Sequence, residues 1–168
     1  LCLRGLGLGI GDEIITPSHT AVATIAGIEQ AGCTPVFADI DPTTRCIDPD
    51  SIVKRVGNNT RAIMPVHIYG QPADMPEILE IAKYHRLEVI EDCSQAHGAE
   101  IDGQKVGTFA NLSAFSCYPT KNLGGTGDGG VILCRSKDFA DKIKALRQYG
   151  WNEHRESTIP GFNSRLDE

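Results

Sequence analysis

The sequence predicts an α/β protein whose sheet is mostly parallel and is covered by helices on both faces. Short apolar, strand-like runs alternate along the chain with longer segments whose apolar residues recur at helical spacing. The segments between the strands are long enough to hold a helix, which parallel neighbours in a sheet require. Hydrophobic residues make up 40% of the 168 residues and charged residues 23%, a balance that suits one domain with a buried core.

The first part of the chain contains three predicted strands and two predicted helices. The strands are expected at residues 12–17, 34–40 and 60–67. Residues 20–32 predict a helix that stops at Gly32, since glycine commonly follows a helix end. The next helix is expected to begin with Asp48 as its cap and Pro49 in its first turn. One face of this helix is predicted to carry Ile52, Val53 and Val56.

The second part of the chain continues the alternation with three strands and two helices. The strands are expected at residues 87–92, 111–118 and 129–135. Asp74, followed three residues later by Glu77, forms a capping-box pattern at a helix start. The apolar side of this helix is predicted to contain Met75, Ile78, Leu79 and Ala82. A closing amphipathic helix is predicted over residues 136–150, and its apolar residues are Phe139, Ile143 and Leu146.

Charge and hydropathy exclude several classes of function. The 16 basic and 22 acidic residues give a net charge of −6 without a basic cluster, which argues against nucleic-acid binding. No apolar run approaches the ~20 residues of a membrane span, and the given sequence does not begin with the charged-then-apolar pattern of a signal peptide. We therefore expect a cytoplasmic protein without a membrane partner. The sequence begins inside what reads as the end of a helix and stops without a terminal signal, so we expect a piece of a longer protein.

The cysteines and histidines do not show the spacing of a metal site, and no metal is predicted. No C-x-x-C pair occurs, so the thiols are expected to be reduced and to pack as small hydrophobic groups. The six cysteines are Cys2, Cys33, Cys46, Cys93, Cys117 and Cys134. The five histidines contain no H-E-x-x-H pattern, and His97 is expected to be structural.

The stretch SCYPTKNLGGTGDGG, residues 116–130, is the most unusual part of the sequence. Its glycines follow Lys121, whereas a phosphate-binding P-loop places glycines before its lysine. A lysine can instead form a Schiff base with a carbonyl and then carry a proton. With a pyridoxal phosphate (PLP) cofactor, a carboxylate must keep the pyridine nitrogen protonated, and donors must bind the phosphate. Asp92 and Ser116 lie at predicted strand ends, where parallel sheets bind ligands, and they offer these groups.

Each of these residues alone has an ordinary explanation. A lysine is most often a surface charge, an aspartate a helix cap or ion-pair partner, and a serine a strand-end hydroxyl. A G-x-G-x-x-G match within residues 125–130 leads into a strand rather than a helix, which argues against a dinucleotide site. Asp92, His97 and Ser116 lack the G-x-S-x-G elbow of a hydrolase. The order aspartate, serine, lysine favours PLP chemistry without establishing it.

Several blocks of the chain resemble the DegT/DnrJ/EryC1/StrS family of PLP-dependent sugar aminotransferases. VIEDCSQAHGA (89–99) is similar to the family's V-I-E-D-A-A-Q-A-H-G-A. AFSCYPTKNLGGTGDGG (114–130) is similar to its A-F-S-F-Y-P-T-K-N-L-G-x-x-G-D-G-G. Further matching blocks are GDEIITPSHTAVAT (11–24), MPVHIYGQPADM (64–75) and GFNSRLDE (161–168). The blocks lie in the family's order and cover nearly the whole chain.

The resemblance implies the large domain of a fold-type I PLP-dependent transferase. By resemblance, Lys121 would form the Schiff base with PLP, Asp92 would pair with the pyridine nitrogen, and Gln95 would lie beside the ring. Ser116 would bind the cofactor phosphate, and Asn163 would reach the phosphate in the neighbouring subunit of a homodimer. The implied reaction transfers an amino group, usually from glutamate, to a keto group of a nucleotide-linked sugar.

The sequence departs from the family pattern in a few places. Ala21 stands where many members carry an aromatic residue that stacks on the PLP ring, so His19 or a residue from elsewhere must cover that face. Cys117 replaces a common phenylalanine. The family's first phosphate-binding loop and its C-terminal small domain would lie outside residues 1–168, so this part of the large domain is expected to be inactive alone. A keto-cyclitol aminotransferase and a non-catalytic PLP-binding member remain alternatives.

Overall fold

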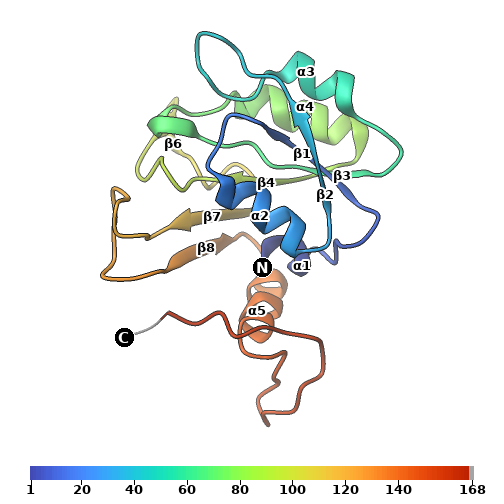
Figure 1. The fold of residues 1–168 in the computed structure, drawn as a ribbon, viewed down its shortest axis with the longest axis vertical. Helices are drawn as coiled ribbons and strands as arrows, with labels where there is room; N and C mark the ends of the chain where they lie inside the picture. Colours follow the sequence, from blue (N-terminus) through green and yellow to red (C-terminus); the bar gives the residue numbers. More distant parts are fainter. Residues whose placement is uncertain (167–168) are drawn as a thin grey trace.

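The computed structural model describes residues 1–166, in which six strands form one sheet in the order β2-β1-β3-β4-β7-β8 (Figure 1). These strands are β1 (Glu13–Pro17), β2 (Thr34–Ala38), β3 (Thr60–Ile63), β4 (Glu88–Asp92), β7 (Leu112–Ser116) and β8 (Gly130–Cys134). Neighbours are parallel from β2 to β7, and β8 runs antiparallel beside β7. The prediction of an α/β chain with a mostly parallel sheet is confirmed.

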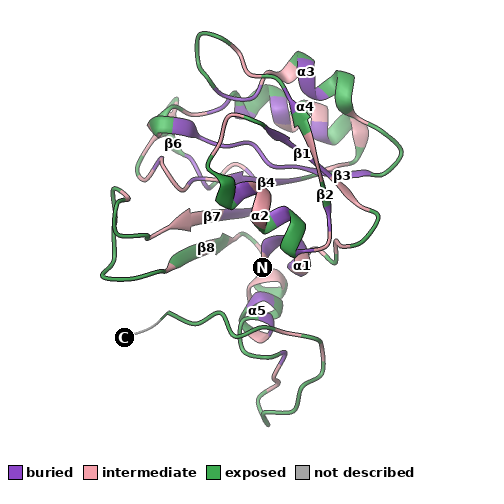
Figure 2. Cartoon of the chain, viewed as in Figure 1, coloured by how far each residue is buried: buried purple, intermediate pink, exposed green. Residues whose placement is uncertain are grey.

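Helices cover both faces of the sheet, as predicted (Figure 1). They are α1 (Cys2–Gly5), α2 (Val22–Gln30), α3 (Pro49–Arg55), α4 (Met75–His85) and α5 (Lys137–Leu146). Because successive residues of a strand point to opposite faces, Ile14 and Ile15 of β1 enter different cores. Ile15 packs with apolar residues of α3 and α4, and Ile14 packs with those of α1, α2 and α5. Figure 2 shows the central strands β1, β3 and β4 buried between these helices.

The helix starts have the capping residues that the sequence predicts. The Asp48 side chain accepts the N–H of Asp50 at the start of α3, and Pro49 follows it. The Asp74 side chain accepts the N–H of Glu77 at 3.2 Å at the start of α4. Helix α2 ends just before Gly32, as expected, although it begins two residues later than predicted.

Three further details differ from the prediction. Helix α5 ends at Leu146, four residues before the predicted end at residue 150. Val53 is 48% exposed although it is predicted on the apolar face of α3, whereas its neighbour Ile52 is fully buried. Neighbouring positions of a helix point about 100° apart, and the inward face of this seven-residue helix is too narrow for both. The strand predicted over residues 60–67 ends at Ile63, because Pro65 has no N–H for the ladder. Pairing resumes only at an isolated bridge between Val66 and Asp92.

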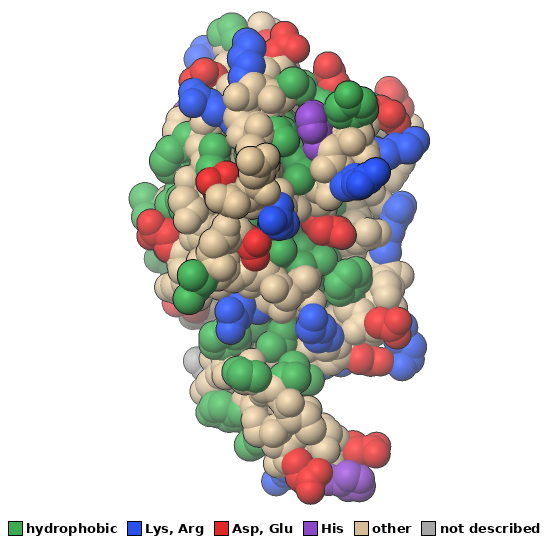
Figure 3. Space-filling model, turned by 90° about the vertical axis from the view of Figure 1, so that its right-hand side faces the viewer, with side chains coloured by type: hydrophobic (Ala, Val, Ile, Leu, Met, Phe, Trp, Pro, Cys, Tyr) green, Lys and Arg blue, Asp and Glu red, His purple; other side chains and the backbone are tan. Residues whose placement is uncertain are grey.

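The sequence does not predict the small hairpin of β5 (Glu100–Ile101) and β6 (Gln104–Lys105), or the single turn η1 (Ile68–Gly70). Each strand of the hairpin has two residues and η1 has three, so these elements are too short to show an apolar period. After α5, the chain runs away from the sheet and then turns back, so that residues 163–166 lie beside β7 and β8 (Figure 1). On the face in Figure 3, acidic and basic side chains are interspersed rather than gathered by sign. All six cysteines are unpaired thiols, as predicted, and no helix within residues 1–166 has the length and apolar character of a membrane span.

Candidate active site

The candidate site lies at the carboxyl edge of the sheet, where the strand order reverses. Helix α2 follows β1 on one face, and α3 and α4 follow β2 and β3 on the other, so the connections diverge between β1 and β3. Parallel sheets bind ligands at such switch points. A cavity of about 370 Å³ opens there, within the roughly 300–1,000 Å³ typical of ligand sites. Its walls include four predicted site residues, Asp92, Gln95, Ser116 and Lys121.

Lys121 lies in the connection from β7 to β8. Its backbone N–H donates to the Tyr118 carbonyl at 2.8 Å, which closes a turn beside the cavity. A Cβ at Gly124 would lie 2.5 Å from the Pro119 carbonyl oxygen, so only glycine allows the chain to fold back this closely. The glycines after the lysine therefore shape the turn that holds it. Within residues 1–166 the Lys121 ammonium makes no ion pair or hydrogen bond, which leaves it available to a ligand.

Asp92 ends β4 and is held at both carboxylate oxygens. Its Oδ1 accepts the N–H of Ser94 at 3.1 Å, and its Oδ2 accepts the hydroxyl of Thr24 at 2.8 Å. Each carboxylate oxygen has two lone pairs, so one on each oxygen remains free for a further donor. The carboxylate can therefore accept a ring N–H in the cavity without losing its present partners.

Among residues 1–166, no hydrogen bond uses the donor groups of the Ser116 and Gln95 side chains. The Tyr118 N–H donates to Ser116 Oγ at 3.2 Å, so the serine hydroxyl proton is left for an anionic acceptor such as a phosphate. The Tyr69 N–H donates to Gln95 Oε1 at 2.8 Å, which orients the amide and leaves its NH₂ group to donate. Both residues line the cavity, and each offers the hydrogen-bond donor that its expected role requires.

His19 and Asn163 are not brought to this cavity. The His19 ring packs edge-on against the Tyr69 ring, with 5.6 Å between centroids. Asn163 lies after α5 beside a separate hollow of about 720 Å³, and its Oδ1 accepts the Arg165 Nε–H at 2.9 Å. Contact of His19 with a cofactor ring and a role for Asn163 in a neighbouring subunit's site stay predictions.

Glu91, the residue before Asp92, connects the strand that carries Asp92 to neighbouring segments through buried hydrogen bonds. It is fully buried and accepts four hydrogen bonds, one of them from His67 Nε2 at 3.2 Å. The other three, at 2.7, 2.9 and 2.7 Å, come from the N–H groups of Gly107, Phe109 and Ala110. These bonds tie the end of β4 to the segment that leads into β7, the strand that carries Ser116. Burial acts to raise the pKa of this carboxyl, but hydrogen bonds from His67, Ala110 and Gly107 hold it below its ordinary value.

His67, Glu91 and Cys93 form a cluster of metal-ligand type, but hydrogen bonds already occupy the imidazole and carboxylate atoms. The Ala73 N–H donates to His67 Nδ1 at 3.0 Å, so that nitrogen carries no proton and Nε2 must donate to Glu91. The imidazole is therefore neutral and has no lone pair left for a metal. Burial, with the carboxylates of Glu91 and Asp92 adding to it, raises the pKa of the Cys93 thiol, which agrees with its predicted role as a packing residue.

We expect acid to destabilise the full-length protein partly through Glu91. Because the pKa of this carboxyl is lower in the folded state, its contribution is fully present above its ordinary value of 4.5 and is lost as pH falls toward the folded value. Glu91→Gln should reduce the free energy of unfolding at pH 7 by roughly 3 kcal/mol and flatten its dependence on pH below about 5. Denaturant unfolding at several pH values tests this, with exposed Glu80→Gln as the matched control. An unchanged acid slope in Glu91→Gln would contradict the assignment.

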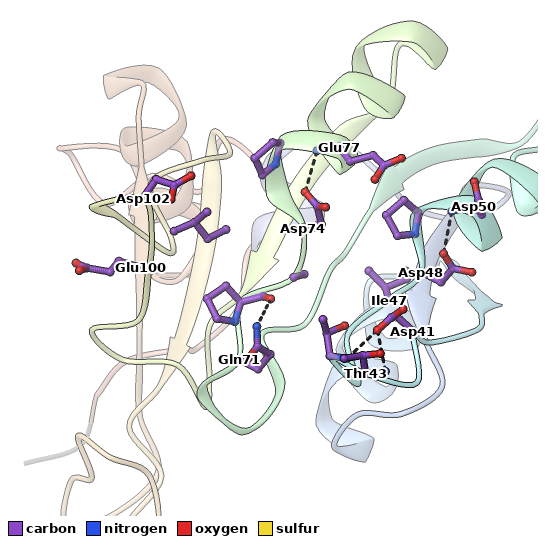
Figure 4. Close-up of a pocket in the computed structure, with 16 residues that line it drawn as sticks. Asp41, Thr43, Ile47, Asp48, Asp50, Gln71, Asp74, Glu77, Glu100 and Asp102 are labelled. Atoms are coloured by element: carbon purple, nitrogen blue, oxygen red, sulfur yellow. Dashed lines mark hydrogen bonds between the residues drawn. The ribbon is translucent and has the colours of Figure 1, made fainter.

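A larger hollow of about 920 Å³ beside α3 and α4 is rich in acidic side chains (Figure 4). They are Asp41, Asp48, Asp50, Asp74, Glu77, Glu100 and Asp102. Asp48 and Asp74 are the caps of α3 and α4. Hydrogen bonds from the N–H groups of Thr44 and Thr43 hold the pKa of Asp41 below its ordinary value. Since these carboxylates stabilise loops and helix starts, the smaller cavity with the lysine is the better candidate for chemistry.

Sequence reasoning does not identify Thr20 and Thr24, which also line the cavity. A partial signal exists, because Thr20 follows soon after β1 and Thr24, four residues later, lies in the first turn of α2. Residues after a parallel strand lie at the same edge as those after its neighbours. The predicted elements therefore place Thr20 at the same edge of the sheet as Asp92, but its distance from Asp92 depends on the strand order, which the sequence does not give.

Solved structures share the fold. The crystal structure of Streptomyces venezuelae DesV in complex with a ketimine intermediate has a TM-score of 0.95 and 42% identity, over 98% of this chain and 44% of that one. NtdA from Bacillus subtilis with bound cofactor PMP has a TM-score of 0.91 and 35% identity, over 98% of this chain and 38% of that one. The fold and the site at its edge define the class: this is the fold of the fold-type I PLP-dependent transferases.

Sequence comparison then gives the family. The family model of the DegT/DnrJ/EryC1/StrS aminotransferases matches residues 1–168, and the chain belongs to this family. A UDP-N-acetyl-3-dehydro-alpha-D-glucosamine 3-aminotransferase of Acidithiobacillus ferrooxidans is 45% identical over 169 residues, which cover 100% of this chain and 46% of that protein. The chain spans less than half the length of the curated relatives it matches.

Proposed function

We propose that the full-length protein is a PLP-dependent aminotransferase that moves an amino group from glutamate onto the keto group of a nucleotide-linked sugar. The meeting of Lys121, Asp92 and Ser116 in one cavity at the switch point carries this proposal. The named activity of the A. ferrooxidans relative, amination of a UDP-linked sugar, supports the substrate class. Residues 1–168 would form part of the PLP-binding large domain.

The groups that line the cavity fit the cofactor. Lys121 offers an amine to its aldehyde, Asp92 offers free lone pairs to its ring nitrogen, and Ser116 offers a hydroxyl proton to its phosphate. The Gln95 NH₂ group is free to donate to its phenolic oxygen. A flat aromatic ring also needs apolar side chains to pack against, and the cavity is lined by Ala21, Ala23 and Val66.

When bound, PLP supplies a carbonyl that links to amines and a ring that stabilises negative charge next to that link. The chain's own residues do the remaining work. Asp92 holds the proton on the pyridine nitrogen, because its charge favours the protonated form of that atom. The Lys121 Nζ, once a donor amine replaces it, takes a proton from the donor's α-carbon and acts as the general base. The turn around Gly124 keeps this amine beside the cavity.

The whole protein is also proposed to be a cytoplasmic homodimer. Asn163 follows α5 and lines a hollow beside β7 and β8 rather than the cavity that holds Lys121. This placement supports a role for its amide in a neighbouring subunit, where it would donate to the cofactor phosphate. The ring-covering group is proposed to come from His19 or from a segment outside these residues, since Ala21 offers no ring.

The function is tested on the full-length protein loaded with PLP. Addition of glutamate alone should release about one equivalent of 2-oxoglutarate per bound cofactor, and release should become catalytic when UDP- or dTDP-linked keto sugars are added. A keto-cyclitol acceptor in the same screen tests the alternative substrate. Bound cofactor with no 2-oxoglutarate, whichever acceptor is present, would contradict the proposal and favour a non-catalytic PLP-binding protein.

A further inference from the structure

Thr24 contacts the Asp92 carboxylate directly. Its hydroxyl oxygen lies 2.8 Å from Asp92 Oδ2, and its side chain is buried in the first turn of α2. The Thr20 hydroxyl, four residues earlier, lies 2.8 Å from the Thr24 hydroxyl. A chain of polar groups thus runs from the start of α2 to the end of β4, and all three line the cavity.

The direction of these hydrogen bonds follows from the chemistry of a carboxylate. Because a carboxylate only accepts, Thr24 donates its hydroxyl proton to Asp92 and accepts the proton of Thr20. Hydrogen bonds to a charged acceptor are shorter and stronger than neutral ones, and successive hydroxyl donors polarise one another. The Ser94 N–H holds the opposite oxygen at 3.1 Å. With a donor at each oxygen, the carboxylate is held against rotation about its Cβ–Cγ bond.

We propose that Thr24 is a positioning residue that acts through Asp92. It fixes the carboxylate in the rotation at which a free lone pair faces the ring nitrogen of the cofactor. This inference rests on the proposed function, because it assumes that Asp92 meets that nitrogen. The backbone donor at Ser94 is present whatever side chain stands there, whereas the Thr24 hydroxyl is a donor that a single substitution removes.

A double-mutant cycle on the full-length, PLP-loaded protein tests the proposal. Thr24→Val removes the hydroxyl and keeps the shape, and it should lower kcat at least tenfold while KM for the amino donor stays within about threefold, because bonds to charged groups are the costly ones to lose. Thr24→Ser should restore kcat to within about threefold of wild type. In the Asp92→Asn background, Thr24→Val should change kcat by less than about twofold, since its effect passes through the carboxylate.

Cofactor affinity provides a second readout that does not depend on turnover. Thr24→Val should raise the dissociation constant for PLP several-fold when Asp92 is present, and should leave it unchanged in the Asp92→Asn background. Thr16→Val is the matched control, because the Thr16 hydroxyl is equally buried but donates to the Met64 carbonyl, away from the cavity. Melting temperatures identify any variant that fails to fold, and Thr24→Ala replaces Thr24→Val in that case.

The outcomes separate this inference from the proposed function. If wild type neither binds PLP nor releases 2-oxoglutarate, the proposed function fails and the inference fails with it. If wild type is active and Thr24→Val matches Thr16→Val in kcat and PLP affinity, the inference alone is wrong. Equal losses from Thr24→Val with and without Asp92 would also overturn it, because Thr24 would then act independently of the carboxylate.

Discussion

Lys121→Ala is expected to abolish turnover in the full-length enzyme, lowering kcat by roughly 10⁴-fold or more. The reason is that one side chain supplies two functions, the covalent link to the cofactor and the proton transfer at the donor's α-carbon. General acid–base catalysis alone is worth about 10²–10⁴-fold. The protein should still fold, because within residues 1–166 the Lys121 ammonium has no partner to lose. Steady-state kinetics and a melting curve measure both effects.

Two further variants sharpen this test. Lys121→Arg keeps the positive charge but not a deprotonable amine, so it should be as inactive as Lys121→Ala. Lys142→Ala removes an exposed lysine from α5 and should leave kcat within about twofold of wild type. An active Lys121→Arg enzyme would mean that the site needs only charge at this position, and the covalent role would be wrong.

Asp92→Asn should lower kcat by roughly 10²–10³-fold while KM for the amino donor changes by less than about threefold. The substitution keeps the shape of the side chain and removes its charge. An ion pair at about 4 Å and an effective dielectric of 20 is worth about 4 kcal/mol, and each ~1.4 kcal/mol is a factor of ten in rate. Because the charge acts on the bond-breaking step rather than on substrate binding, the loss belongs in kcat.

The control for Asp92→Asn is Asp102→Asn. Asp102 is exposed in the β5–β6 turn with a φ of 48°, a backbone conformation that asparagine also adopts readily. Its rate constants should match those of wild type. If Asp92→Asn also kept the wild-type kcat, the carboxylate would have no electronic role, and the proposed pairing with the ring nitrogen would have to be abandoned.

Much of the fold could be predicted because its strongest signals are local. Apolar runs mark the strands, and Asp48 and Asp74 mark helix starts with groups that accept backbone N–H donors. The strand order could not be read in this way, since the pairing of β1 with β3 and of β4 with β7 joins segments that are distant in sequence. The β5–β6 hairpin could not be predicted because it has no apolar period. Val53 is apolar like the buried residues of its helix but lies at an exposed position.

Four of the candidate site residues could be proposed from the sequence because they lie in blocks that resemble a known family. Lys121, Asp92, Gln95 and Ser116 lie in recognisable blocks, and the structure places them along one cavity. The supporting contacts were not predicted, because a buried glutamate or a helical threonine has no distinctive sequence pattern. Their roles depend on which N–H groups and carboxylates the fold brings within about 3 Å. The predictions for His19 and Asn163 concern a bound cofactor and a second subunit, so one chain alone does not test them.

The central claim is that Lys121 of the full-length protein binds PLP covalently, and one measurement tests it most directly. The protein is incubated with PLP, reduced with borohydride, digested and analysed by mass spectrometry, with Lys121→Arg as the matched control. We predict a pyridoxyl adduct on the wild-type peptide that contains Lys121 and no adduct on that peptide in the variant. A folded wild-type protein with no adduct at Lys121 would contradict the account.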